Sequence, residues 1–334
     1  MTASSHTMSA LRLDGPGAPL TLVQLPRPVA APGEVLVRIA AAGLNPLDTK
    51  IRADQAGHAR QPAPAVLGID MSGTVEAVGD GSEGFAPGDA VYGMTGGVGG
   101  VQGSLAEFVS VDARLLAIAP SRIPLADAAA LPLGFITAWE GLVDRANVQP
   151  GQTVFVHGGA GGVGSMAVQL AVARGARVVA TGSAAQLAVI ADMGAIAVDR
   201  HEKDMQAIVD EYTNGDGFDI VYDTLGGATL DASFIAVRRY GGHVVSSLGW
   251  GTHSLAPLSF RAATYSGVFT LMPLLTGNGR EQHGRIMAEA TRLADAGKLR
   301  PVLSTQRFAL VEGNTALDLV ESGRSAGKVI VTLS

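Results

Sequence analysis

The sequence predicts a two-domain α/β protein in which a doubly wound parallel sheet is combined with a second, β-rich domain. Two observations predict this fold. Up to about Leu116, short β-like runs are separated by Gly and Pro, as in irregular antiparallel domains. From Gln152 onward, apolar strands alternate with helical patterns, as in parallel βαβ units. The length of 334 residues also fits two domains of roughly 150 residues each.

The β-rich part shows its strand signals as short apolar runs bounded by turn residues. We expect strands at 20–25, 34–40, 72–78, 90–92 and 105–111. Helical spacing of apolar residues begins near Leu125. The small, polar residues 2–9 are expected to form a frayed tail.

The second part repeats strand and helix in turn. We expect strands at 153–157, 177–181, 196–198, 219–223, 243–248 and 267–271, with helices at 163–174, 184–193, 203–212 and 229–239. The remaining signals are a helix at 281–296, a short strand near Val302, a helix at 311–321 and a strand at 328–333. These are too few for a third domain. We therefore expect residues 128–272 to form the parallel-sheet domain, and residues 1–127 with 273–334 to form the other.

Composition excludes several classes of function. Only 16% of the residues are charged and the formal net charge is -6, so no basic field is present to hold nucleic acid or an acidic membrane. The chain has no Cys, which removes disulfides, thiolate nucleophiles and zinc sites built on sulfur. No apolar run reaches the ~20 residues of a membrane span, and no signal-peptide pattern opens the chain. A cytoplasmic protein with a small-molecule substrate is the resulting expectation.

One motif carries a specific chemical meaning. The segment Gly159-Ala160-Gly161-Gly162-Val163-Gly164 fits G-x-G-x-x-G, follows an apolar strand and opens an amphipathic helix. In that context Gly159 permits the tight turn, Gly161 lets backbone approach a pyrophosphate, and Gly164 lets the helix pack on its strand. Gly162 and Val163 supply N–H groups at the positive end of the helix. The motif therefore predicts a dinucleotide site.

The choice of dinucleotide depends on the end of the next strand, Thr181-Gly182-Ser183. An acidic residue there binds the ribose of NAD, and none is present. Ser183 can donate a hydrogen bond and Arg200 can supply a positive charge, so we expect NADPH, with NADH as the alternative. Arg200 has an alternative interpretation as a solvated loop residue.

Six stretches, in this order, resemble one known superfamily: AAGLNPLDTKIR (41–52), PAVLGIDMSGTVEAVG (64–79), PGDAVYG (87–93), AALPLGFITAWEGL (129–142), GGAGGVG (158–164) and GKVIV (327–331). The chain resembles the medium-chain dehydrogenase/reductase superfamily, in its zinc-free, quinone oxidoreductase-like branch, over nearly its whole length after Ala10. The resemblance implies a GroES-like β-rich catalytic domain, a Rossmann domain, and an active site in the cleft between them.

The same resemblance bears on metals. In zinc-dependent members, ligands stand at the positions of Asn45, Ile69 and Leu133, and none of these three side chains binds zinc. The four-Cys structural zinc lobe is also missing. We therefore expect no metal, and oxidation of an alcohol through a zinc alkoxide is not favoured.

The resemblance places Asn45 beside the nicotinamide, where its amide can hold the oxygen of a quinone or α,β-unsaturated carbonyl that accepts a hydride. Asp48 and Lys50 follow in the same segment and are further catalytic candidates. Relatives often have Tyr at the Lys50 position, so the proton donor stays open. The alternatives are a loop residue that caps its own backbone for Asn45, and a surface ion pair for Asp48 with Lys50.

Further cofactor-site candidates come from the resemblance and from the strand ends. Thr137 matches a family position beside the nicotinamide ring, with a helix Thr bonded to a preceding carbonyl as the alternative. Leu248 and Phe269 are expected to form apolar walls of the site. The strand expected at 267–271 is a sheet edge that relatives pair across a two-fold axis, so a homodimer is expected.

The leading hypothesis is an NADPH-dependent, zinc-independent oxidoreductase that transfers a hydride to a quinone or α,β-unsaturated carbonyl. Two alternatives stay open. One is a zinc-free alcohol or sugar dehydrogenase, which needs a residue that takes up the hydroxyl proton. The other is a non-catalytic NADPH-binding sensor that keeps the fold without turnover.

Overall fold

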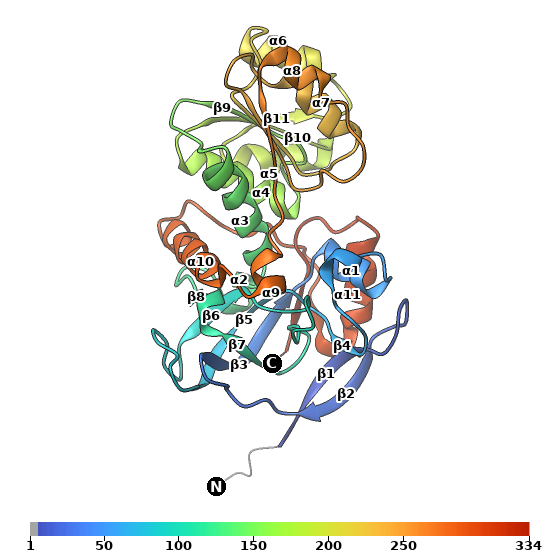
Figure 1. The fold of residues 1–334 in the computed structure, drawn as a ribbon, viewed down its shortest axis with the longest axis vertical. Helices are drawn as coiled ribbons and strands as arrows, with labels where there is room; N and C mark the ends of the chain where they lie inside the picture. Colours follow the sequence, from blue (N-terminus) through green and yellow to red (C-terminus); the bar gives the residue numbers. More distant parts are fainter. Residues whose placement is uncertain (1–5, 334) are drawn as a thin grey trace. The chain divides into compact units, whose positions relative to one another are not determined.

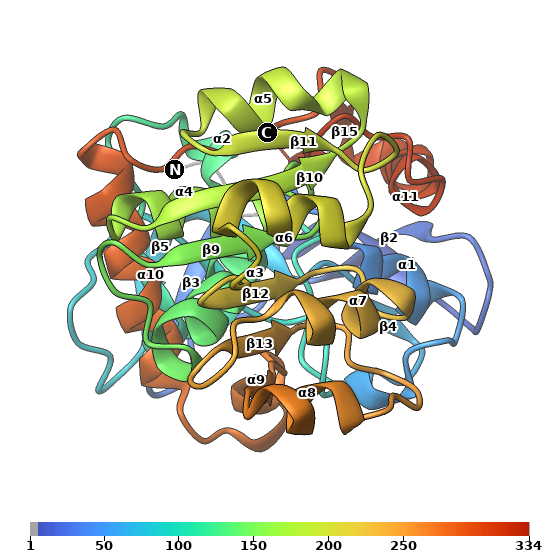
Figure 2. The same ribbon diagram turned by 90° about the horizontal axis from the view of Figure 1, so that it is seen from above.

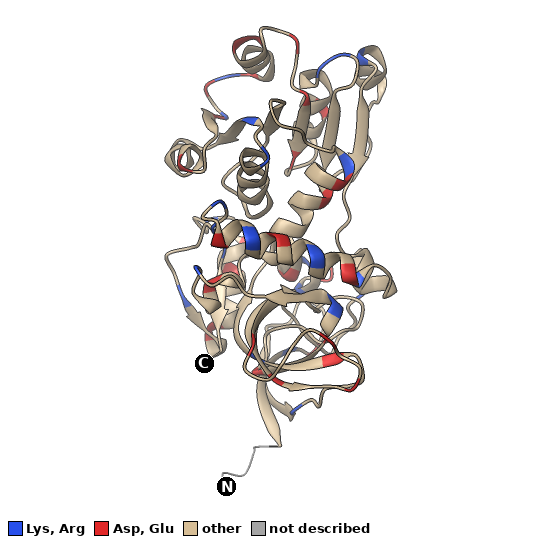
Figure 3. Cartoon of the chain, turned by 90° about the vertical axis from the view of Figure 1, so that its left-hand side faces the viewer, with Lys and Arg blue, Asp and Glu red and all other residues tan. Residues whose placement is uncertain are grey.

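The computed structural model describes residues 6–333, which form two compact units. Unit 1 comprises the described residues of 1–133 and 271–334, and unit 2 comprises Gly134–Thr270. The sequence had placed these divisions at 127/128 and 272/273. None of the helices within residues 6–333 combines the length and the apolar character that a membrane span requires. Acidic and basic residues are interspersed along the chain (Figure 3).

Unit 1 contains two sheets, and both combine segments that are distant in the sequence (Figure 1). Its strands are β1 (Thr7–Leu13), β2 (Thr21–Pro26), β3 (Glu34–Gly43), β4 (Ala65–Val66), β5 (Asp70–Val78), β6 (Ala90–Met94), β7 (Phe108–Asp112), β8 (Leu116–Ile118), β15 (Phe308–Ala309) and β16 (Ile330–Thr332). The small sheet has the order β2-β1-β4. The large sheet has the order β15-β16-β3-β5-β6-β8, with β7 also paired to β3.

Strand β3 is the centre of the large sheet, because β5, β7 and β16 all pair with it in antiparallel register. Its side chains Val35, Val37 and Ile39 are buried. The pairing with β16 brings the C-terminal segment into the sheet that residues 34–118 begin. Gly43, the last residue of β3, is therefore opposite Asp70 of β5 on one side and Ile330 of β16 on the other.

Short helices and one long helix surround these sheets. They are α1 (Pro46–Arg52), α2 (Leu125–Ala128), α9 (Met272–Thr276), α10 (Arg280–Asp295) and α11 (Gly313–Glu321), with 3₁₀ turns η1 (Gly57–Ala59), η2 (Ala113–Leu115) and η5 (Leu310–Glu312). The long helix α10 buries Ile286, Ala290 and Leu293, which recur at helical spacing, and packs on β6, β8 and η2. Tyr92 donates a hydrogen bond of 2.8 Å to the Met287 carbonyl and so joins the sheet to this helix.

Unit 2 is the predicted doubly wound domain. Six parallel strands have the order β11-β10-β9-β12-β13-β14 (Figure 2). They are β9 (Thr153–Val156), β10 (Arg177–Gly182), β11 (Ile196–Asp199), β12 (Ile220–Asp223), β13 (His243–Ser246) and β14 (Thr264–Gly267). The helices and turns are α3 (Pro132–Trp139), which begins in unit 1, η3 (Glu140–Arg145), α4 (Gly162–Ala173), η4 (Ala184–Gln186), α5 (Leu187–Asp192), α6 (Met205–Thr213), α7 (Ala228–Ala236) and α8 (Ala256–Arg261).

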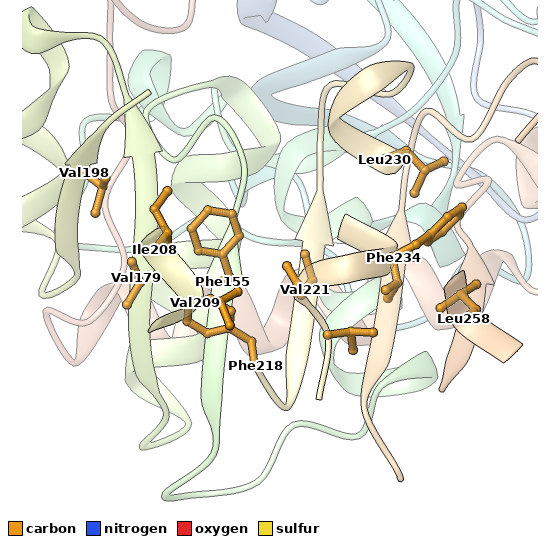
Figure 4. Packing of buried hydrophobic residues seen from close by; sticks show 13 residues of the cluster. Phe155, Val179, Val198, Ile208, Val209, Phe218, Val221, Leu230, Phe234 and Leu258 are labelled. Atoms are coloured by element: carbon orange, nitrogen blue, oxygen red, sulfur yellow. The ribbon is translucent and has the colours of Figure 1, made fainter. Parts of the chain in front are cut away.

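Apolar packing on one face of this sheet holds the strand ends in place. Phe155, Val179 and Val221 of neighbouring strands contact Ile208 of α6 and Phe234 of α7 in one buried cluster (Figure 4). On the opposite face, Gly159 and Ala180 lie against α4 and α5. Because helices cover both faces of the sheet, the parallel strands are nearly uniformly apolar and lack the apolar/polar alternation of a half-buried strand. They were identified from the way in which apolar runs and helical patterns follow one another along the chain.

Three local predictions are wrong. Thr7–Ser9 belong to β1 and pair with β2, so they are not a frayed tail, while residues 2–5 of that prediction lie outside the described residues. The edge strand is β14 at Thr264–Gly267 rather than 267–271, because β14 pairs in register with β13 only over those residues. Near Val302 the chain forms an isolated bridge between Leu303 and Lys328 instead of a strand.

Candidate functional site

The glycine motif forms a backbone cradle at the junction of β9 and α4 in unit 2. A Cβ on Gly164 would lie 2.0 Å from the Gly158 carbonyl oxygen, so the helix can approach its strand this closely only at glycine. The N-cap of α4 is Gly161, which has no capping side chain. The first N–H groups of the helix, including those of Gly162 and Val163, lack partners within the helix and point out of its positive end. This arrangement fits the pyrophosphate of a dinucleotide.

Thr181 supports the cradle from the neighbouring strand β10. Its carbonyl accepts the Gly159 N–H at 2.7 Å, and its hydroxyl oxygen accepts the Gly158 N–H at 3.2 Å. Thr181 is buried. The side chain therefore fixes the turn in which the motif lies, and its predicted contact with the cofactor stays a prediction.

A positive charge lies at the end of β10, where the predicted ribose site is. Gly182 pairs with Asp199 of β11, and the next residue, Arg200, donates its backbone N–H to the Gly182 carbonyl at 3.0 Å. Arg200 is exposed and its Nε donates to Nε2 of His201 at 3.1 Å. The Asp199 carboxylate is buried and accepts the His201 N–H at 2.9 Å. Arg200 and Ser183 thus lie at adjacent strand ends.

The other cofactor-site candidates lie in unit 2 at two places. Leu248 follows the end of β13 and Phe269 follows β14, so both are at the carboxyl edge of the sheet with the glycine motif. Thr137 is in α3, and its hydroxyl shares a hydrogen bond of 3.0 Å with the hydroxyl of Thr270. Its predicted contact with the nicotinamide remains a prediction.

Unit 1 holds a buried polar cluster that the topology of β3 creates. Because Gly43 is paired on both sides, the residues just beyond these pairings meet: Asn45 after β3, Asp70 at the start of β5, and Lys328 before β16. A Cβ on Gly43 would lie 2.0 Å from the Ala129 carbonyl oxygen, so glycine is also required for the segment before α3 to approach. We call Asn45, Asp48, Asp70 and Lys328 the Asn45 cluster.

Asp70 is the acceptor at the centre of the Asn45 cluster. Its Oδ1 accepts the Leu133 N–H at 2.9 Å, at the first turn of α3, where the helix dipole favours a carboxylate. Its Oδ2 accepts from Lys328 Nζ at 2.9 Å and from Asn45 Nδ2 at 3.1 Å. Asp70 is fully buried and the Lys328 side chain is only 8% exposed, so the pair is a buried ion pair with its hydrogen bonds satisfied.

The amide of Asn45 is held on both sides. Its Oδ1 accepts a hydrogen bond from Lys328 Nζ. Its Nδ2 donates to Asp70 and, over a longer distance of 3.3 Å, to the Gly43 carbonyl. Asn45 is also the N-cap of α1. The same residue therefore begins the helix and bonds through its side chain to Asp70 and Lys328. To donate a hydrogen bond to a substrate, Asn45 Nδ2 must release one of these two acceptors, and the Gly43 carbonyl is the more distant one.

Asp48 is fully buried in the first turn of α1. Its Oδ2 accepts the Asn45 N–H at 2.8 Å, while Oδ1 has no hydrogen-bond partner among the described residues. The pKa of Asp48 is raised to about 7, mainly by burial and also by the negative charge of Asp70, while the hydrogen bond from the Asn45 N–H and the charge of Lys328 oppose the increase. The alternative of a surface ion pair between Asp48 and Lys50 is therefore wrong.

Lys50 does not join the cluster. It lies on the exposed side of α1, where it lines a surface depression with Gln55 and Glu321. Among residues 6–333, no group of three or more His, Asp or Glu side chains is arranged to hold a metal ion. The structure therefore brings Asn45 and Asp48 together and leaves Lys50 apart from them.

Sequence reasoning missed Asp70 and Lys328 as site residues. Both stand inside stretches that carried the resemblance, GIDMSG and GKVIV, but neither position drew attention as a titratable group. The two residues are 258 positions apart, and only the pairing of β16 with β3 brings them together. The available signal was a charged residue at the start of the otherwise apolar strand that the sequence predicts at 328–333.

Comparisons with known proteins agree with this architecture. Residues 31–121 match the family described as alcohol dehydrogenase GroES-like domain, and residues 193–331 match the family described as zinc-binding dehydrogenase. The predicted GroES-like and Rossmann-type domains are thereby confirmed. A solved structure of an alcohol dehydrogenase superfamily protein from Novosphingobium aromaticivorans is 53% identical, with a TM-score of 0.96 over 98% of this chain and 100% of that one.

Curated relatives include three named reductases or oxidoreductases. The 2-methylene-furan-3-one reductase of Solanum lycopersicum is 33% identical over 89% of this chain and 71% of its own. The chloroplastic NADPH-dependent alkenal/one oxidoreductase of Arabidopsis thaliana is 32% identical over 89% and 72%. A probable quinone oxidoreductase of Schizosaccharomyces pombe is 31% identical over 98% and 97%. The chain is thus an oxidoreductase enzyme and belongs to the medium-chain dehydrogenase/reductase superfamily, to which the alcohol dehydrogenases also belong.

Proposed function

We propose that this enzyme is an NADPH-dependent, zinc-independent reductase of quinones or α,β-unsaturated carbonyls. The observation that carries the proposal is the Asn45 cluster. At Asn45, one of the positions where the resemblance puts a zinc ligand, the side-chain oxygen is bonded to the ammonium of Lys328, which also bonds to the Asp70 carboxylate. Such a fixed ammonium does not coordinate and acidify an alcohol as a Lewis acid does. The names of the relatives support an acceptor with a conjugated carbonyl or quinone.

The cofactor proposed is NADPH. Arg200 and Ser183 lie at adjacent strand ends beside the expected ribose position, and no carboxylate stands at the end of β10. A guanidinium binds a phosphate through strong, charge-assisted hydrogen bonds. The relative from Arabidopsis thaliana is named for NADPH. The cytoplasmic location expected from the sequence stays a prediction.

The chemistry divides between the cofactor and the chain. NADPH, when bound, supplies a hydride from C4 of its nicotinamide ring to the electron-poor carbon of the acceptor. Negative charge then develops on the acceptor's carbonyl oxygen. We propose that Asn45 Nδ2 donates a hydrogen bond to this oxygen, releasing the 3.3 Å contact with the Gly43 carbonyl. The matching proton comes from solvent or from Asp48, whose pKa of about 7 allows it to hold a proton at neutral pH.

A homodimer is proposed from the edge of the unit 2 sheet. Strand β14 is the terminal strand in that sheet and pairs only with β13 among the described residues. Phe260, just before β14, is 84% exposed. An edge strand beside an exposed aromatic residue is an aggregation risk unless a second copy covers it.

The acceptor class is tested by following the loss of NADPH absorbance with benzoquinones, alkenals and enones. Turnover of any of these without added metal, by protein free of zinc on elemental analysis, is the expected result. Reduction of NADP⁺ that depends on an alcohol would instead identify the dehydrogenase alternative. Tight NADPH binding with no acceptor reduced would identify a sensor.

The cofactor preference is tested with Arg200→Ala. Loss of a charge-assisted contact with the 2′-phosphate is expected to weaken NADPH binding by about 10-fold or more while leaving NADH binding unchanged. Titration calorimetry with both dinucleotides measures this. Arg239→Ala, at another exposed Arg of unit 2, is the matched control. Equal losses for NADPH and NADH would show that Arg200 does not recognise the phosphate.

The dimer is tested by light scattering, which should give twice the 34.0 kDa mass of the chain. Phe260→Glu is expected to shift the protein toward the monomer, because a carboxylate in an apolar interface must be desolvated. Val29→Glu introduces a carboxylate at an apolar position of unit 1 that is 83% exposed, and it should leave the mass of the dimer unchanged. A monomeric wild-type protein would refute the proposal.

The burial of Asp48 predicts a pH-dependent gain in stability from Asp48→Asn. The folded chain holds a proton on Asp48 up to about pH 7, whereas the unfolded chain loses it near pH 3.8. Wild-type stability therefore falls as pH rises through this window, with a cost that approaches about 4 kcal/mol above pH 7. Urea unfolding should show Asp48→Asn stabilised at pH 8 and much less at pH 5. Asp80→Asn is an exposed control, and an equal gain at both pH values would contradict the assignment.

A further inference from the structure

We propose that Lys328 is a positioning residue that fixes and polarises the Asn45 amide for its role as hydrogen-bond donor. This inference rests on the proposed function, because it concerns the group that we assign to the acceptor's oxygen. It assigns a role to the Lys of the closing GKVIV stretch, which neither the cofactor site nor the sheet pairing explains.

The backbone around Lys328 is rigidly held. Its N–H donates to the Val302 carbonyl at 2.8 Å, and its carbonyl accepts the Ser304 N–H at 2.9 Å. Two residues later, Ile330 pairs with Gly43 of β3. The side chain starts from this clamped position and is only 8% exposed, so its ammonium has little freedom to leave Asn45.

The contact determines which way the amide faces. An asparagine amide can rotate by half a turn, which exchanges its oxygen and nitrogen with little change in shape. An ammonium group can only donate hydrogen bonds. Contact with Lys328 Nζ is therefore compatible with one orientation of the amide, in which Oδ1 faces Nζ and Nδ2 points away from it. Hydrogen bonds in series also polarise one another, so donation to Oδ1 strengthens donation from Nδ2.

The competing explanation is that Lys328 only neutralises Asp70. Both roles use the same ammonium, since Lys328 Nζ bonds to Asn45 Oδ1 and to Asp70 Oδ2. Replacing Lys328 alone leaves an uncompensated buried carboxylate and is expected to impair folding. Lys328→Met combined with Asp70→Asn removes both charges together, and this double variant separates the two roles.

The first experiment compares that double variant with Asp70→Asn alone, which keeps the contact between Lys328 and Asn45. We expect kcat to be at least about 10-fold lower in the double variant than in Asp70→Asn, with the KM for NADPH the same in both variants. Lys328→Arg keeps a positively charged donor and should retain more activity than the double variant. Lys298→Met, at an exposed Lys, is the matched control. Equal kcat values for the double variant and Asp70→Asn would overturn the inference.

The second experiment does not depend on turnover. Asn45 is one of five asparagines, so its side-chain amide can be followed by selective ¹⁵N labelling and assigned by its loss in Asn45→Ser. We expect hydrogen exchange at this amide to be at least about 10-fold faster in the double variant than in Asp70→Asn. Unchanged exchange would refute positioning by Lys328 even in an active reductase. Faster exchange in a protein that reduces no acceptor would refute the proposed function and leave the positioning supported.

Discussion

The ion pair between Asp70 and Lys328 is the interaction on which the candidate site of unit 1 depends. It joins the start of β5 to the segment before β16, and it meets α3 through the Leu133 N–H. Burying two charges costs several kcal/mol per ion before their attraction and hydrogen bonds are counted. The cost is offset here because each Asp70 oxygen has a donor and the ammonium has two acceptors. The pair then fixes Asn45, so the position of a neutral amide depends on a charged neighbour.

The turn between β9 and α4 in unit 2, which we predict to bind the pyrophosphate, contains no charged side chain. The cradle at β9 and α4 consists of backbone N–H groups whose direction is set by glycine and by the Thr181 contacts. The apolar cluster around Phe155 and Phe234 keeps the strand ends in register beneath it. Arg200, which follows β11, is exposed, so its guanidinium is accessible to a ligand. We therefore expect main-chain geometry to provide anion binding and one side chain, Arg200, to provide selectivity between the two dinucleotides.

Local signals in the sequence were sufficient for unit 2 and insufficient for the Asn45 cluster. Apolar runs and the glycine motif predicted the parallel strands β9 to β13, because βαβ units form from neighbouring segments. Only the edge strand β14 was misplaced, where fewer pairing partners constrain the register. In unit 1, by contrast, the contact between Asp70 and Lys328 arises from pairing across a long stretch of chain, because β16 pairs with β3. Periodicity within a window of residues contains no information about such pairings.

The composition of the Asn45 cluster also limits the chemistry that it can support. Two carboxyl groups and one ammonium are buried together, so the cluster is electrically neutral when Asp48 is protonated. The raised pKa of Asp48, about 7, means that this proton is held below pH 7. While it is protonated, Asp48 cannot act as the base that removes a proton from an alcohol. The cluster does contain an amide donor held in one orientation and a carboxylic acid. Those groups suit an acceptor whose oxygen gains negative charge, which is the requirement of quinone and enone reduction.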